Sequence, residues 1–201
     1  MTSVPPTPAP EEGDRLRSEL MAWLNEFGLS APAILGMARR AKPMRVAPNT
    51  PIILQGEQGE CVYFLIEGRL QIRIKSGDSD EVVGERLPVT MVGEISYFSG
   101  TPASETVQVS PRNEALLMQL NYAGLSEVVE DHPEVSDRMQ RVGDMRLITQ
   151  KFGLANYGLF MNLIGWRRDR FALNRALLPT LERLLETELL PRLSENDRIL
   201  D

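Results

Sequence analysis

The spacing of hydrophobic residues changes twice along this chain of 201 residues, from helical to strand-like and back. Between about Asp14 and Gly28, apolar side chains recur every three or four positions, which predicts an amphipathic helix ended by a C-terminal glycine. A second short helix is predicted at residues 31–41, with a proline in its first turn. Residues 1–13 are predicted to be a disordered tail, because this proline-rich stretch has too little apolar surface to offset the entropy of ordering.

From Met44 the period of the apolar positions becomes two, which is typical of β-strands. Turn residues such as Asn49-Thr50-Pro51 and Ser76-Gly77-Asp78 separate the segments. Eight short strands at this spacing predict an antiparallel sandwich, barrel or jelly roll. The expected strands are residues 44–47, 51–55, 61–66, 70–75, 81–87, 91–93, 105–109 and 114–120.

After Leu120 the helical period returns, with a short helix expected at residues 123–131 and a longer one that starts at Pro133. The longer helix carries an apolar stripe that ends near Thr149, and this stripe is predicted either to pack on the β-domain or to form a homodimer through residues 133–151. We therefore divide the chain into the tail, a β-domain with its N-terminal helices at residues 14–132, and a C-terminal helical region at residues 133–201.

The C-terminal region carries a strongly apolar segment at residues 152–166, too short for the roughly 20 residues of a membrane span. We predict no transmembrane segment there and a protein partner that binds residues 152–193. The cluster Arg167, Arg168 and Arg170 could contact phosphate, an acidic partner or a membrane surface; the alternative, which the single acidic interruption favours, is a solvated helix face.

Composition narrows the function further. A formal charge of −6 and a pI near 5.0 argue against a surface built to coat nucleic acid. His132 is the only histidine and Cys61 the only cysteine, so no zinc site and no Ser-His or Cys-His nucleophile is expected. Cys61 is predicted to be a small buried hydrophobe. The lone cysteine and the absence of a basic-then-apolar leader predict a cytoplasmic protein.

The stretch Met91–Val107 is the one candidate binding element. A strand-like approach ends at Gly93 and Glu94, and the next residues can form one helical turn before Ser99–Pro102 breaks it. The free N–H groups of such a turn suit an anion, and Glu94 could accept a sugar hydroxyl. The alternative is an ordinary turn between two strands, which the local pattern by itself favours, because no Walker-type loop is present.

Two separate stretches resemble the cyclic nucleotide-binding domain family. The run Gly56-Glu57-Gln58-Gly59-Glu60-Cys61-Val62-Tyr63-Phe64-Leu65-Ile66-Glu67-Gly68 is similar to the family's Gly-x-x-Gly-Asp-x-x-Tyr-x-Ile-x-x-Gly segment. The run from Gly93-Glu94-Ile95-Ser96 to Thr106-Val107 is similar to the family's phosphate-binding cassette, and residues 116–141 resemble the exit from the β-domain. The resemblance implies a mainly β fold with flanking helices: an eight-stranded antiparallel jelly-roll barrel followed by C-terminal helices.

The resemblance also implies a binding pocket for cAMP or cGMP and no other cofactor. Glu94 would accept the ribose hydroxyl, and the N–H groups of Ile95 and Ser96 would meet the phosphate. Gly93, Ser104 and, by rough alignment, Thr149 would complete the site.

The chain departs from the family pattern at one position of the cassette. Ala103 stands where the family's phosphate-pairing arginine belongs, and Glu105 adds a negative charge nearby unless it points outward. We therefore expect weak or lost cyclic nucleotide binding, unless Arg112, Arg146 or Lys151 folds over the pocket.

These observations predict a non-enzymatic regulatory or adaptor protein of signal transduction that acts through protein–protein contacts of its C-terminal helices. One alternative is a ligand-independent scaffold or oligomerisation component. Another is a divergent transcription regulator, although the roughly 50 residues after Gln150 show no helix-turn-helix. Ligand, partner and oligomeric state are not specified by the sequence.

Overall fold

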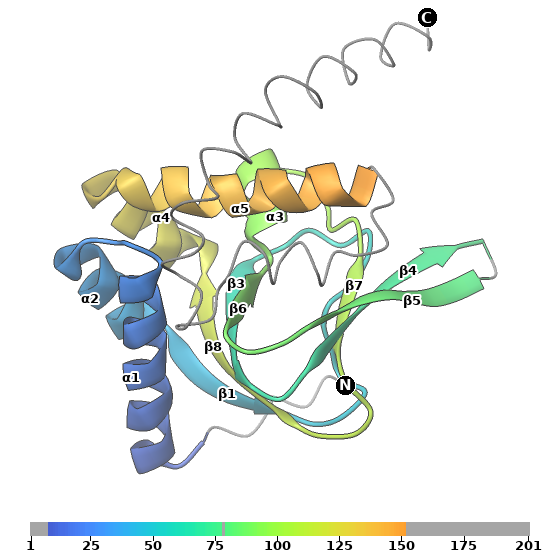
Figure 1. The fold of residues 1–201 in the computed structure, drawn as a ribbon, viewed down its shortest axis with the longest axis horizontal. Coiled ribbons are helices and arrows are strands. Elements are labelled where there is room, and N and C mark those ends of the chain that lie inside the picture. Colours follow the sequence, from blue (N-terminus) through green and yellow to red (C-terminus); the bar gives the residue numbers. More distant parts are fainter. Residues whose placement is uncertain (1–7, 78, 152–201) are drawn as a thin grey trace, which may run out of the picture. The chain divides into compact units, whose positions relative to one another are not determined.

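A computed structural model describes residues 8–77 and 79–151, with residues 144–151 described as helical backbone only (Figure 1). All of these residues belong to one compact unit that runs from Met1 to Leu154. The helices are α1 (Pro10–Glu26), α2 (Ala31–Arg40), α3 (Glu94–Ser99), α4 (Tyr122–Asp131) and α5 (Glu134–Lys151); the strands are β1 (Lys42–Val46), β2 (Pro51–Ile53), β3 (Cys61–Glu67), β4 (Leu70–Ser76), β5 (Ser79–Arg86), β6 (Thr90–Val92), β7 (Thr106–Val109) and β8 (Ala115–Asn121).

The strands form two four-stranded antiparallel sheets, in the orders β1-β8-β3-β6 and β2-β7-β4-β5. Consecutive strands alternate between the sheets in a jelly-roll arrangement, except that β4 and β5 form a hairpin within the second sheet, and the eight expected strands are all present. The predicted eight-stranded jelly-roll fold is confirmed, and among the described residues its strands pair within two facing sheets that no further pairing closes.

The core lies between the two sheets and receives side chains from both. Leu65 and Leu117 come from the first sheet, and Leu70 and Ile72 come from the second. All four side chains are at most 2% exposed. This packing holds the two sheets together and fixes the face on which the cassette residues lie. The other members of the cluster are Val46, Val92, Val107, Val109 and Ala115.

Strand β3 is buried on both faces, which explains its nearly continuous apolar run. Leu65 points between the sheets, whereas the Phe64 ring packs edge-on against Trp23 of α1, with their ring centroids 5.8 Å apart. Helix α1 therefore covers the outer face of the first sheet, where it contacts β1, β3 and β8 (Figure 1).

Helix α1 begins earlier than predicted. It starts at Pro10, with Glu11 and Glu12 in its first turn, and Gly13 is buried. The predicted disordered tail of residues 1–13 is therefore too long at its C-terminal end. Pro10 was counted with the tail prolines, but a proline in the first helical turn loses no hydrogen bond and favours a helix start. The predicted contacts of residues 152–193 and the Arg167–Arg170 cluster lie outside the described residues.

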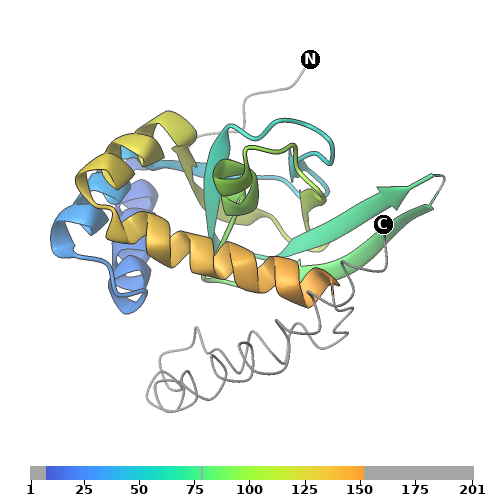
Figure 2. The ribbon, with the colours of Figure 1, turned by 90° about the horizontal axis from the view of Figure 1, so that it is seen from above.

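Helices α4 and α5 lie across one end of the sandwich, and α5 runs from the side of α2 toward the side of β4 and β5 (Figures 1 and 2). Val135 and Met139 on α5 are 0% and 1% exposed. The stripe residue Met139 is thus buried within the chain, whereas Val142, the next residue of the predicted stripe, is half-buried. No helix among the described residues is both long and apolar enough to cross a membrane.

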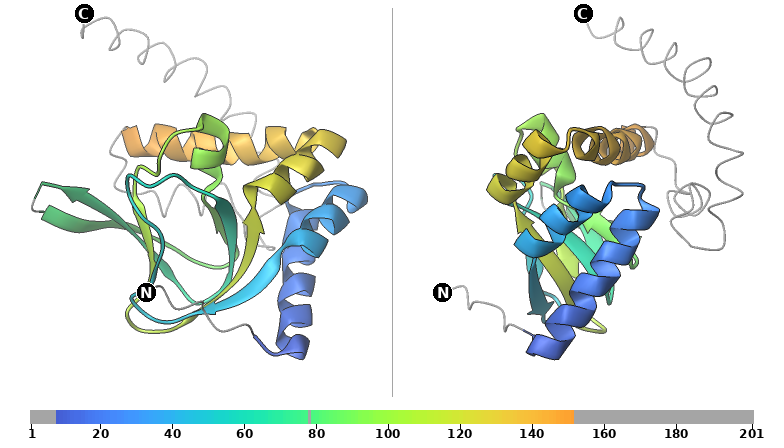
Figure 3. Two further views of the ribbon diagram at one scale, coloured as in Figure 1. Left: turned by 180° about the vertical axis from the view of Figure 1, so that it is seen from behind. Right: turned by 90° about the vertical axis from the view of Figure 1, so that its left-hand side faces the viewer.

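The hairpin of β4 and β5 extends away from the other strands (Figure 3). Its register shifts between Ile72 and Arg73, so that Ile72 pairs with Gly84 and Arg73 with Val82, and Val83 is an extra residue. This bulge reverses which residues of β5 face the core on its two sides.

Candidate ligand-binding site

Gly93 turns the chain from β6 into α3. Its φ of 94° lies in the left-handed region that favours glycine. A Cβ atom at this position would also lie 2.5 Å from the carbonyl oxygen of Cys61 on β3. Both constraints require glycine, and together they place Glu94 at the first position of α3.

The first turn of α3 carries two buried polar side chains. Glu94 is 1% exposed and Ser96 is 7% exposed. The N–H groups of Ile95 and Ser96 belong to the same turn, where backbone donors have no intrahelical acceptor. The local arrangement that the Gly-Glu run predicts is therefore present.

The loop before β7 is held against the Gly56–Glu57 turn by two backbone hydrogen bonds. The N–H of Ala103 donates to the Glu57 carbonyl at 2.9 Å, and the N–H of Gly56 donates to the Ala103 carbonyl at 2.8 Å. The Ala103 side chain is only 7% exposed and faces the pocket. The backbone at position 103 is thus fixed, and its side chain points to the site.

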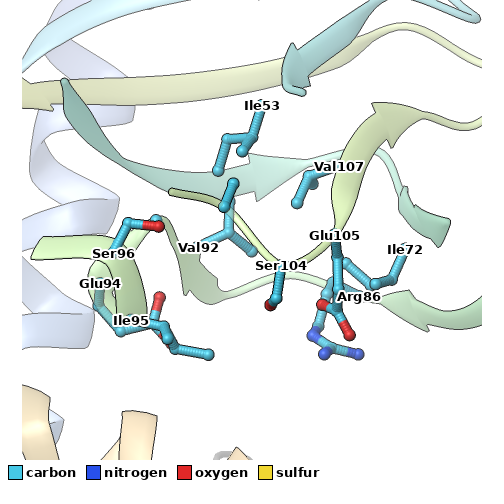
Figure 4. Close-up of a pocket in the computed structure, with 12 residues that line it drawn as sticks. Ile53, Ile72, Arg86, Val92, Glu94, Ile95, Ser96, Ser104, Glu105 and Val107 are labelled. Carbon is cyan, nitrogen blue, oxygen red and sulfur yellow. The ribbon is translucent and has the colours of Figure 1, made fainter. Parts of the chain in front are cut away.

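A pocket with a cavity of about 50 Å³ opens between α3 and this loop (Figure 4). Six of the seven predicted site residues line it: Gly93, Glu94, Ile95, Ser96, Ala103 and Ser104. The seventh, Thr149, lies on α5, and its side chain is outside the described residues. Its predicted role stays a prediction.

Two charged residues line the pocket beyond the predicted site residues. Arg86 at the end of β5 was not predicted, and Glu105 lines the pocket although an outward orientation was also expected. Figure 4 shows both side chains extending toward the same side as Ser104. The presence of Glu105 in the pocket follows from its half-buried position beside the loop. The presence of Arg86 depends on the β4–β5 register, which the sequence does not reveal.

Comparison with known proteins identifies this arrangement. Residues 43–132, which include the pocket, match the family model of the cyclic nucleotide-binding domain. Residues 43–132 belong to this family. The match confirms the resemblance drawn from the glycine-rich run and the cassette.

Relatives that share the cyclic nucleotide-binding domain include a channel and a transcriptional regulator. The chain is 31% identical to the potassium channel AKT2 of Oryza sativa over 54% of this chain and 13% of the channel. It is 26% identical to a CRP-like cAMP-activated global transcriptional regulator of Mycobacterium tuberculosis over 69% of this chain and 62% of the regulator. The chain thus spans less than two thirds of either curated relative.

Solved structures show the same fold. A cyclic nucleotide-binding domain from Methylobacillus flagellatus superposes with a TM-score of 0.58 at 14% identity, covering 75% of this chain and 85% of that one. At this identity the likeness supports the fold of the cyclic nucleotide-binding domain and does not extend to its ligand.

Two tyrosines tie the cassette of the cyclic nucleotide-binding domain to α4. Tyr122 donates a hydrogen bond of 2.7 Å to the carbonyl oxygen of Gly93, and the hydroxyls of Tyr97 and Ser126 lie 3.0 Å apart. A Cβ atom at Gly59 would clash with the Tyr122 hydroxyl. The second glycine of the Gly-x-x-Gly run is therefore needed because Tyr122 packs against it.

Burial is the main cause of raised pKa values in two tyrosines near the cassette. It raises the pKa of Tyr122 to about 12, with Cys61 and Glu94 adding to the shift. Burial likewise raises the pKa of Tyr63 to about 12. Both hydroxyls are therefore protonated and neutral at physiological pH.

Cys61 is half-buried, whereas the sequence predicts a small buried hydrophobe at this position. The amide Nε2 of Gln119 donates to its sulfur at 3.2 Å, and burial raises the pKa of the thiol. The raised pKa does not favour the thiolate that nucleophilic chemistry needs.

Of the three cations that could compensate for Ala103 by folding over the pocket, only Arg112 has a described side chain. Arg112 is exposed in the turn between β7 and β8 and does not line the pocket. The side chains of Arg146 and Lys151 lie outside the described residues. Across the part of the chain that the structure describes, no three His, Cys, Asp or Glu side chains are arranged to hold a metal ion.

Proposed function

We propose that this chain is a non-enzymatic regulatory or adaptor protein whose cyclic nucleotide-binding domain binds cAMP or cGMP only weakly. The observation that carries the proposal is the composition of one pocket. Glu94, implied by the family to accept the ribose, is kept and buried, whereas the methyl group of Ala103 faces the pocket where an arginine is implied. The carboxylate that the family implies for the ribose is thus present, whereas the cation implied at position 103 is absent.

Electrostatics supports weak binding of an anion. The described side chains that line the pocket include two carboxylates, Glu94 and Glu105, and one guanidinium, Arg86. A carboxylate beside a phosphate in a partly buried site is repulsive, because the effective dielectric constant there is well below that of water. Glu105 therefore adds to the loss caused by Ala103.

The output is proposed to pass through α5 to the residues that follow it. Gly143 on α5 packs on the cassette, since a Cβ atom there would lie 3.7 Å from Ile95 Cγ1 and 3.9 Å from Glu94 Cγ. A ligand that displaces Glu94 or Ile95 would therefore act on α5 directly. Residues 152–193 are proposed to bind the protein partner.

Titration calorimetry of the full chain with cAMP and cGMP tests the ligand half of this proposal. We expect weak heats for the native chain, loss of these heats in Glu94→Ala, and tighter binding in Ala103→Arg. Absence of binding in both the native chain and Ala103→Arg would contradict the proposal. That result would favour the alternative of a ligand-independent scaffold.

A further inference from the structure

We propose that Arg86 is the residue that pairs with the anionic group of the ligand, and that Glu105 lowers the affinity by competing for the same guanidinium. This inference rests on the proposed function, because it assumes an anionic ligand in the pocket. In this proposal, Arg86 at the end of β5 pairs with the anion that an arginine at position 103 of the cassette would otherwise bind.

The sheet register points Arg86 toward the pocket. Arg86 is paired directly opposite Leu70, which is 0% exposed in the core between the sheets. Directly opposed residues of an antiparallel pair project from the same face. Arg86 therefore leaves the sheet on its inner face, at the end where the core opens into the pocket.

Gly84 leaves room for the guanidinium of Arg86. It is the next residue of β5 on the inner face, and a Cβ atom there would lie 3.5 Å from Nη1 of Arg86. The same nitrogen donates a hydrogen bond of 3.1 Å to the carbonyl oxygen of Glu85. The side chain thus folds back over a strand position that carries no side chain of its own.

The surroundings of Arg86 define what it can bind. Within the described part of the chain it is the only cationic side chain that lines the pocket, which it shares with Ser104 and Ala103. Arginine presents several donors in a planar fork that matches a phosphate group. Because Ala103 carries only a methyl group, the cation that pairs with the phosphate has to come from Arg86 on β5.

Glu105 sets how available that guanidinium is. It lines the same small cavity from the position just before β7, and Figure 4 shows its carboxylate on the side to which Arg86 extends. A carboxylate and a phosphate are both acceptors for a guanidinium, so the anion of a ligand has to compete with Glu105. Neutralising Glu105 should therefore tighten anion binding, and only while Arg86 is present.

Titration calorimetry of the full chain with cAMP and cGMP, and with the uncharged adenosine and guanosine, tests this pair. Glu105→Gln is expected to raise cyclic nucleotide affinity about threefold to tenfold. Adding Arg86→Gln to that variant is expected to remove the gain. The double variant should bind cyclic nucleotides about tenfold or more weakly than Glu105→Gln alone. Affinity for the uncharged nucleosides is expected to stay within about twofold, since they carry no phosphate.

Matched controls remove the same charges outside the pocket. Arg73→Gln breaks an exposed pair with Asp80 on the same hairpin, and Glu85→Gln breaks one with Arg69. Both should leave binding unchanged, and thermal unfolding checks that every variant is folded.

Three outcomes would overturn the assignment while leaving the proposed function intact. The first is tight binding in Ala103→Arg together with no effect of Arg86→Gln on affinity. The second is no gain in affinity in Glu105→Gln. The third is an equal loss of affinity for nucleosides and cyclic nucleotides in Arg86→Gln. Failure of Ala103→Arg to bind at all would instead contradict the proposed function.

Discussion

At the scale of single residues, Glu94 and Ala103 separate the shape of the site from its affinity. Their backbones are fixed by independent contacts, the left-handed turn at Gly93 and the two hydrogen bonds of Ala103 to the Gly56–Glu57 turn. A side chain introduced at position 103 would therefore project into the pocket without rebuilding the loop. The identity of this one side chain is expected to decide how tightly an anion binds.

Ala103→Arg is expected to raise the affinity for cAMP or cGMP about tenfold to more than a hundredfold. The reason is a new charge-assisted hydrogen bond, worth about 1.5–3 kcal/mol. Calorimetry measures the change, and Ala103→Gln, which adds length and donors without charge, is the control. Equal gains for the arginine and glutamine variants would show that charge is not the missing element.

Tyr122→Phe is expected to lower the free energy of unfolding by about 0.5–1.5 kcal/mol. The substitution removes the hydrogen bond to the Gly93 carbonyl and leaves that acceptor without this donor. Urea unfolding at neutral pH measures the loss. Tyr97→Phe, which removes the hydroxyl that meets Ser126, tests whether the cost is specific to the Gly93 contact.

The same residue predicts an alkaline pH dependence. The pKa of Tyr122 is raised from 10.0 to about 12 in the folded chain, so folding favours its protonated form. This contribution to stability is fully present below pH 10 and is lost as the pH rises toward 12, because the unfolded chain releases its proton first. Stability curves should be flatter between pH 10 and 12 in Tyr122→Phe than in the native chain; unchanged steepness would contradict the assignment.

At the scale of elements, the contact between α5 and α3 links the pocket to the chain beyond it. Gly143 sits within α5, where glycine costs about 1 kcal/mol relative to alanine. Its lack of a side chain lets α5 approach the cassette over Glu94 and Ile95. A glycine at this position exchanges helix stability for a close contact with the site.

Gly143→Ala is expected to stabilise the protein by about 0.5–1 kcal/mol. The added Cβ would make ordinary contacts of 3.7 Å and 3.9 Å, and alanine favours the helix. Gly36→Ala in α2 is the comparison, because there the Cβ would lie only 3.3 Å from Val128 Cγ2 and the gain should shrink or vanish. Chemical denaturation measures both; a larger gain at position 36 would contradict the contact geometry.

At the scale of the whole described unit, the core between the two sheets supplies the frame for the pocket. Leu117 of β8 is 0% exposed and belongs to the cluster that also holds Leu70 and Ile72 of the second sheet. Loss of this packing would affect both sheets and, through them, the cassette between β6 and β7. Stability and ligand binding are therefore expected to depend on the same core.

Leu117→Ala is expected to cost about 2–5 kcal/mol of unfolding free energy, because it leaves a cavity in a close-packed core. Val83→Ala is the control, since Val83 on β5 is 52% exposed and surface changes usually stay within about 0.5 kcal/mol. Urea unfolding curves compare the two variants. Similar costs would show that the cluster between the sheets is not the main core.

The sequence by itself determined the elements and the cassette. Period-two spacing and turn residues located all eight strands, because alternation and turn chemistry are local properties. Gly93-Glu94 and the Gly-x-x-Gly run located the turn into α3, because a left-handed turn and a close backbone approach restrict a position to glycine. The sequence alone also shows that position 103 carries no cation.

Tertiary structure decided which distant residues share the pocket. The bulge at Val83 sets the face to which Arg86 points, and neither the bulge nor the pairing of Arg86 with Leu70 has a local signal. The division of the described strands into two sheets is likewise a tertiary property, because strand pairing depends on residues far apart in sequence. The charge of the pocket is thus a product of register, whereas its outline is a product of local sequence.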